Sequence, residues 1–87
     1  VKPLNFKNKG SVSENWSLRV EIEDNESGIS KYAMYINEQW VLADYDEKNK
    51  LLMYQIDHHL RQGHNSLKVV VTDKVGNETI YAATILR

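Results

Sequence analysis

A chain of 87 residues, with 41% hydrophobic and 26% charged residues, is long enough for one domain built around one hydrophobic core. Its formal net charge of −1 lacks the basic excess that gives nucleic-acid-binding proteins most of their affinity, and no apolar run approaches the ~20 residues of a membrane span. We therefore expect neither a nucleic-acid partner nor a membrane span. The absence of cysteine also excludes disulfides, thiolate metal sites and cysteine nucleophiles.

The sequence begins at Val1 without an initiator methionine, and it has no recognisable signal peptide. We therefore expect residues 1–87 to be a single domain excised from a longer protein.

Alternation of apolar and polar residues predicts strands along most of the chain. Near the N-terminus, Pro3 favours an edge strand, because proline cannot donate to a sheet. The main predicted strands cover residues 16–24, 29–36, 39–44, 50–57, 64–73 and 77–86. Residues 37–38 are expected to form a two-residue hairpin turn. For residues 51–60 a helix is the alternative, because apolar residues also recur there at helical spacing.

The strand over residues 64–73 is expected to be central, because Leu67, Val69 and Val71 alternate with more polar neighbours. We expect Leu60 to plug the end of the core. For the strand over residues 77–86 the pattern does not decide which side faces the core, because the residues on both of its sides are partly apolar.

These patterns predict an all-β fold, an immunoglobulin-like β-sandwich of about seven antiparallel strands. Seven positions are expected to be essential to this structure. They are Trp16, Gly28, Trp40, Leu60, Leu67, Val69 and Gly76. The two tryptophans among them are expected to face inward, into the core.

Three spaced motifs carry a resemblance to a known family. They read D-x-x-SGI, Y-x-x-x-I-x-x-x-W and L-x-x-G-x-H/N-x-L-x-V-x-V-x-D-x-x-GN. The matching residues are Asp24, Ser27, Gly28, Ile29, Tyr32, Ile36, Trp40, Leu60, Gly63, Leu67, Val69, Val71, Asp73, Gly76 and Asn77, and His64 or Asn65 fills the H/N position. Over residues 16–86 the chain resembles an immunoglobulin-like module that follows the catalytic domain in some Bacteroidetes M23-type metallopeptidases, zinc endopeptidases that cut peptidoglycan crosslinks.

The resemblance implies an accessory module in a bacterial cell-envelope or secreted protein, located outside the cytoplasm. Such a module would be a spacer, or a platform that packs against a peptidase domain of the same polypeptide. The peptidase zinc motifs H-x-x-x-D and H-x-H do not occur in this sequence. We therefore expect no catalytic residues, no metal ligands and no cofactor in this chain; any zinc endopeptidase activity would belong to a neighbouring domain.

Three histidines lie in or beside one connection: His58, His59 and His64. Imidazole is a common zinc ligand, and Asp57 is the one carboxylate at a suitable spacing. Adjacent residues of a strand, however, point to opposite faces. We therefore expect these histidines to be solvated loop residues.

Acidic residues are expected to gather at one pole of an immunoglobulin-like sandwich, where three connections meet. They are Asp24, Glu26, Asp44, Asp46, Glu47 and Asp73. Clustered loop carboxylates bind calcium, which makes a calcium-stabilised adhesion repeat one alternative. The simpler interpretation is that Asp24 and Asp73 cap their own turns.

A second alternative is a module that binds cell-wall glycan or peptide. Tyr35, Tyr45 and Tyr81 are the candidate contact residues, because exposed aromatic rings can stack on sugars.

Overall fold

The structure is a computed structural model that describes residues 2–12, 17–22 and 29–87. Within these residues the chain forms strands and no helix, so the all-β prediction is confirmed and the helical alternative for residues 51–60 is wrong. No helix that could cross a membrane occurs in this part of the chain. The strands are β1 (Lys2–Pro3), β2 (Gly10–Ser11), β3 (Ser17–Glu21), β4 (Ile29–Ile36), β5 (Gln39–Val41), β6 (Asp44–Asp46), β7 (Leu51–Gln55), β8 (His64–Asp73) and β9 (Glu78–Leu86).

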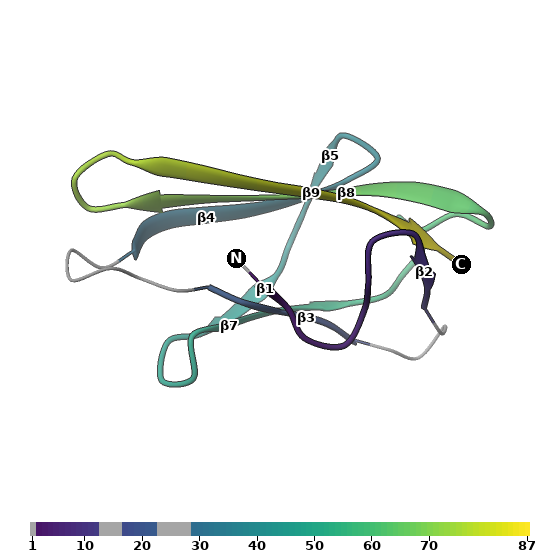
Figure 1. Cartoon of the computed structure of the whole chain (residues 1–87), viewed down its shortest axis with the longest axis horizontal. Helices are drawn as coiled ribbons and strands as arrows, with labels where there is room; N and C mark the ends of the chain where they lie inside the picture. The colour runs from purple at the N-terminus through teal and green to yellow at the C-terminus, as the bar shows by residue number, and fades with distance from the viewer. Residues whose placement is uncertain (1, 13–16, 23–28) are drawn as a thin grey trace.

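The strands form two sheets that lie over each other as two layers (Figure 1). One sheet has the order β1-β3-β7-β6, and the other has the order β2-β9-β8-β4-β5. Neighbouring strands are antiparallel except β2 and β9, which pair in parallel. The predicted immunoglobulin-like β-sandwich is therefore confirmed, with Pro3 in an edge strand as expected. The described residues form nine strands where about seven are predicted, and one parallel pair where all are predicted to be antiparallel.

The core lies between the sheets, because each long strand turns every second side chain inward. On β8 these are Leu67, Val69 and Val71, all buried as predicted. Leu60, in the connection from β7 to β8, is also buried in the core, as expected. The other buried members of the core are Phe6, Val12, Leu18, Val20, Ile22, Met34, Ile36, Val41, Ala43, Leu52, Tyr54, Ile56 and Ile85.

Residues 39–46 differ from the prediction of one strand over 39–44. β5 pairs with β4 in the five-stranded sheet, whereas β6 pairs with β7 in the other. The chain thus changes layer between β5 and β6. The Asp46 carboxylate accepts hydrogen bonds from the backbone and side chain of Asn49, which close the turn into β7. Tyr45 and Asp46, which lie outside the predicted strands, are therefore part of β6.

The turn between β4 and β5 is the predicted two-residue hairpin. Asn37 and Glu38 both have positive φ, 50° and 69°, which is the backbone of a type I′ turn. This turn fixes the register, so that Tyr35 lies opposite Trp40 and Met34 lies opposite Val41.

Two further turns are built from polar side chains. The Asp73 carboxylate accepts hydrogen bonds from the backbone N–H groups of Val75 and Asn77, which confirms its predicted capping role, and Gly76 has the positive φ that its turn requires. Before β8, Asn65 is buried and organises the preceding loop, as described below. Trp16 and Gly28, two of the expected structural positions, and the expected cap Asp24 lie outside the described residues.

Candidate functional site

The outward side of the five-stranded sheet, called here the outer face, carries an unusual mixture of side chains. Cross-strand partners share a face of a sheet. Lys68 of β8 lies between Tyr35 of β4 and Ala82 of β9, and Tyr35 in turn lies opposite Trp40 of β5. The Lys68 ammonium lies 5.6 Å from the centre of the Tyr35 ring, a cation–π contact.

A second row on the outer face is apolar. Val70 of β8 lies between Ala33 of β4 and Ile80 of β9, and Ile80 is 55% exposed. Beside this row, Leu42 follows β5 and is 74% exposed. We call the five residues Ala33, Val70, Ile80, Trp40 and Leu42 the apolar patch. Large exposed apolar side chains that gather on one face are typical of interaction surfaces.

Trp40 corrects a prediction, because it is 57% exposed and not part of the core. The type I′ turn pairs Met34 with Val41, and Met34 faces inward; Val41 therefore takes the inward position on β5. Trp40 must then face outward beside Tyr35. Leu42, two residues further along the chain, is exposed as well.

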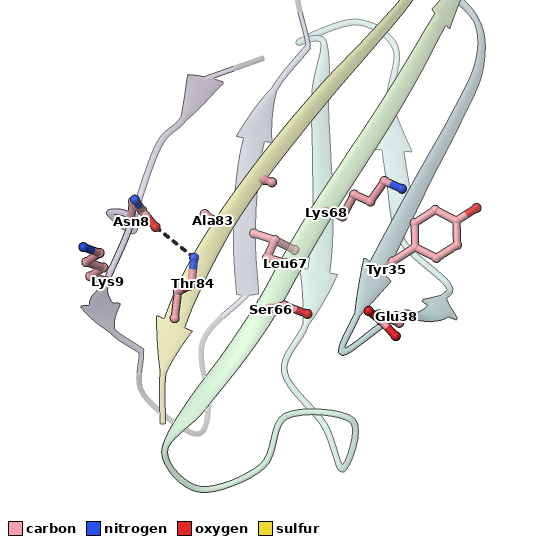
Figure 2. Close-up of a pocket in the computed structure, with 10 residues that line it drawn as sticks. Asn8, Lys9, Tyr35, Glu38, Ser66, Leu67, Lys68, Ala83 and Thr84 are labelled. Carbon is pink, nitrogen blue, oxygen red and sulfur yellow. Dashed lines mark hydrogen bonds between the residues drawn. The ribbon is translucent and has the colours of Figure 1, made fainter.

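Next to the apolar patch, the outer face has an open hollow of about 750 Å³ (Figure 2). Tyr35 and Lys68 line one side of it, and Thr84 and Asn8 line the other, where the Asn8 side chain accepts a hydrogen bond from the Thr84 backbone. Glu38 and Ser66 add further polar atoms. The hollow offers one aromatic ring and several hydrogen-bonding groups to a polar ligand.

The three tyrosines considered for glycan binding are not brought together. Tyr35 is on the outer face, but Tyr45 and Tyr81 pack against the core from opposite sheets. Tyr45 also contacts the ring of Tyr32, with 5.1 Å between ring centres. Burial raises the pKa of Tyr81, in keeping with its partly covered ring. Of the three, only Tyr35 faces the hollow.

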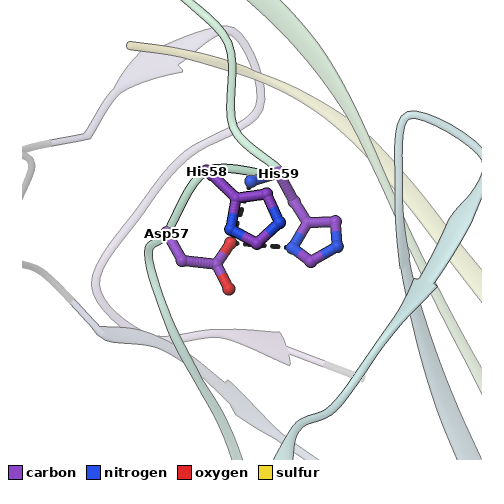
Figure 3. A group of neighbouring side chains, drawn as sticks. All are labelled: Asp57, His58 and His59. Atoms are coloured by element: carbon purple, nitrogen blue, oxygen red, sulfur yellow. Dashed lines mark hydrogen bonds and ion pairs between the residues drawn. The ribbon is translucent and has the colours of Figure 1, made fainter.

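The connection after β7 brings together a second set of chemically active side chains. Asp57, His58 and His59 lie in a tight turn, and their potential ligand atoms are all within 4.8 Å of one another (Figure 3). The two imidazole rings lie 4.2 Å apart, centre to centre, with planes inclined by 32°. The expectation that the two histidines point to opposite faces is wrong, because β7 ends at Gln55 and residues 58–59 belong to a turn.

The Asp57 carboxylate is the centre of this turn. Its Oδ1 accepts hydrogen bonds from the Tyr54 hydroxyl and from the His59 backbone N–H, and it lies 2.9 Å from His59 Nδ1. Burial acts to raise the pKa of Asp57, but the hydrogen bonds from Tyr54 and His59 outweigh it and lower that pKa to about 2. Asp57 is therefore ionised at neutral pH. Burial and the neighbouring Asp57 both raise the pKa of the Tyr54 hydroxyl, so Tyr54 stays a donor.

His64, the third histidine of this region, is exposed at the start of β8, opposite Leu86. It is not a member of the Asp57–His58–His59 group.

The acidic pole expected for calcium does not appear as a ligand group within residues 2–12, 17–22 and 29–87. In these residues the one group of three potential metal ligands is Asp57, His58 and His59. Asp46 and Asp73 direct their carboxylates to their own turns. Asp24 and Glu26 lie outside the described residues.

Sequence reasoning predicted neither the convergence of Asp57, His58 and His59 nor the exposure of Trp40. A signal existed for each. The end of alternation after Ile56 marks the end of a strand, and the two-residue turn at 37–38 fixes which residues of β5 face inward.

No protein-family model and no curated protein matches this chain. Three chains among solved structures do match, and one of them is CopC from Methylosinus trichosporium OB3b, determined as a crystal structure. The two chains are 13% identical and superpose with a TM-score of 0.66, over 97% of this chain and 89% of CopC. At this low identity the similarity establishes one thing, that the chain has a β-sandwich fold like that of CopC.

Proposed function

We propose that this chain is a non-catalytic immunoglobulin-like accessory module of a bacterial cell-envelope or secreted protein. Its outer face packs against a neighbouring domain of the same polypeptide, a peptidase domain of the M23 type. The observation that carries the proposal is the exposure of Trp40 and Leu42 on one face of the sandwich.

The composition of the apolar patch supports packing against another protein domain. Tryptophan, the residue most enriched among the energetically dominant positions of interfaces, stands at its edge, and the aliphatic row of Ala33, Val70 and Ile80 continues it across three strands. Interfaces between domains of one chain typically bury about 600–1,500 Å², an area that several strands of a sheet can supply. The patch is on the side of the sheet opposite the core, so covering it leaves the fold intact.

The test uses the whole parent polypeptide and calorimetry. Domains that share an apolar interface unfold together or stabilise each other. The double variant Trp40→Ala, Leu42→Ser should split one transition into two, or lower the melting temperature of the neighbouring domain. Val75→Ser is the matched control, because Val75 is 70% exposed but lies in the turn between β8 and β9, outside the patch. Identical thermograms for the parent and the double variant would refute the packing role.

A second candidate function, glycan binding, is favoured by the hollow beside the patch. Sugars present C–H faces that stack on aromatic rings and hydroxyls that bond to polar side chains, and the hollow supplies both through Tyr35, Glu38 and Ser66. The assay is retention of the 87-residue chain on insoluble peptidoglycan. Tyr35→Ala should abolish retention and Tyr35→Phe, which keeps the ring, should preserve it. Failure of the unmodified chain to be retained eliminates this candidate and leaves the packing role untouched.

A further inference from the structure

The turn after β7 places three metal-binding side chains in consecutive positions, at a place that the packing role does not use. Asp57 supplies a carboxylate, and His58 and His59 supply imidazole nitrogens, with all potential ligand atoms within 4.8 Å of one another (Figure 3). A turn is what makes three adjacent residues converge, since a strand would send them alternately to opposite sides.

The backbone of this turn is held in place by contacts from distant parts of the chain. The Leu60 N–H donates to the Asp57 carbonyl, and the Leu60 side chain is buried in the core. The Arg87 guanidinium donates to the carbonyls of Asp57 and Leu60, at 3.0 and 2.6 Å, and the Asn37 side chain donates to the His59 carbonyl. The three ligand side chains therefore project from a fixed frame, which lowers the entropic cost of binding an ion.

The carboxylate is also oriented. The hydrogen bonds that Asp57 Oδ1 accepts from the Tyr54 hydroxyl and the His59 N–H hold the carboxylate toward the His59 ring, as the groups around metal ligands commonly do. Oδ1 and His59 Nδ1 are 2.9 Å apart. Two ligands that each lie about 2.1 Å from one ion are separated by roughly 3–3.5 Å, so an ion fits between them with a small movement.

The third ligand must move further. Ligand atoms on one ion are at most about 4.2 Å apart, twice the usual bond length, so the 4.8 Å spread has to contract. His58 is exposed, so its ring can turn toward the other two by changing its contact with the His59 ring. His59, by contrast, already faces Asp57.

We propose that Asp57, His58 and His59 form a binding site for a divalent ion of the late first transition row, with Zn²⁺, Ni²⁺ and Cu²⁺ as the ions of matching chemistry. Two imidazole nitrogens and one carboxylate oxygen suit these ions, whereas Ca²⁺ and Mg²⁺ prefer oxygen ligands alone. Three protein ligands leave a coordination position for water. The positive charge of Arg87 beside the turn opposes the binding of a cation.

The first test is nuclear magnetic resonance of the histidine rings during addition of ZnCl₂ to the 87-residue chain. The ring signals of His58 and His59 should shift or broaden together at micromolar zinc. His64 serves as an internal control, because it is exposed and outside the group. Equal shifts of all three rings would indicate nonspecific binding and overturn the proposal.

The second test is isothermal titration with zinc. His58→Ala removes an exposed ligand without touching the core, so its circular dichroism should be unchanged while its affinity for zinc falls at least 10-fold. His59→Ala should lose at least as much, and His64→Ala should bind like the unmodified chain. No measurable zinc binding at 100 µM protein, or unchanged binding by His58→Ala, would refute the site.

Discussion

Replacing Trp40 by alanine distinguishes a surface tryptophan from a core tryptophan by its cost in stability. A tryptophan side chain that is fully covered removes about 150–250 Å² from water. Trp40 is 57% exposed, so it covers roughly 85 Å², which at about 25 cal/mol per Å² corresponds to at most ~2 kcal/mol. Residual structure in the unfolded chain reduces such values by about 10–40%, so we expect Trp40→Ala to lower the free energy of unfolding by about 1–2 kcal/mol.

The matched comparison is Leu67→Ala. Leu67 is 1% exposed in the centre of β8, and removal of such a side chain leaves a cavity that typically costs about 2–5 kcal/mol. Urea denaturation followed by far-ultraviolet circular dichroism measures both variants, since this signal does not depend on tryptophan fluorescence. A loss of 3 kcal/mol or more for Trp40→Ala, in the range expected of a core side chain, would show that the ring is buried and that β5 faces the other way.

Three further predictions concern the polar turns. Asn65→Ala removes a buried side chain that accepts from Arg61 N–H and donates to the Arg61 and Gly63 carbonyls, and it should cost about 2–4 kcal/mol in urea denaturation. A loss below about 0.5 kcal/mol, the usual range of a surface substitution, would contradict this role. The pKa of Asp57 is about 2 in the folded chain and about 3.9 in an unfolded chain. The ionised carboxylate therefore contributes its full stability above pH ~3.9, and this contribution is lost as the pH falls through about 2. In the Asp57→Asn variant the melting temperature should therefore fall less between pH 4 and pH 2 than in the unmodified chain. An equal fall in both proteins would contradict this role of Asp57. Tyr54→Phe removes a hydrogen bond to the Asp57 carboxylate and should raise the pKa of Asp57 measured by carbon-detected titration.

Alternation alone located the strands that are buried on one side. Leu67, Val69 and Val71 on β8, and Leu52 and Tyr54 on β7, are buried where the period of two places them. Such strands are readable because one face meets the core and the other meets water, and this difference is recorded in the sequence itself.

Alternation failed where both faces carry apolar residues. In the segment Trp40-Val41-Leu42-Ala43 either set of alternating residues has the hydrophobicity of a core set, so alternation does not decide whether Trp40 or Val41 faces inward. What decides the facing is the pairing with β4. Met34 faces inward, and Val41 is its cross-strand partner, so Val41 also faces inward. The change of layer between β5 and β6 also depends on pairing with β7, which no local pattern records.

The convergence of Asp57, His58 and His59 is only partly readable from the sequence. The turn is closed by local hydrogen bonds, from the Leu60 N–H to the Asp57 carbonyl and from the His59 N–H to the Asp57 carboxylate. It is also held by Arg87 and Asn37, which are 30 and 22 positions away in the sequence from their partners. Contacts at that separation cannot be inferred from the spacing of three adjacent residues.

The hairpin turn at 37–38 decides which residues of β5 reach the surface, so its strength can be tested directly. Glu38 has φ of 69°, a left-handed conformation that costs a residue with a Cβ roughly 1–2 kcal/mol, and glycine is the preferred residue at this position of a type I′ turn. Glycine recovers that cost but loses about 0.5–1 kcal/mol to the greater freedom of the unfolded chain. Glu38→Gly should therefore raise the free energy of unfolding by about 0.5–1 kcal/mol in urea denaturation, whereas Glu38→Ala, which keeps the Cβ, should bring no gain. Destabilisation by glycine would mean that residue 38 is not left-handed, and the register that turns Trp40 outward would lose its support.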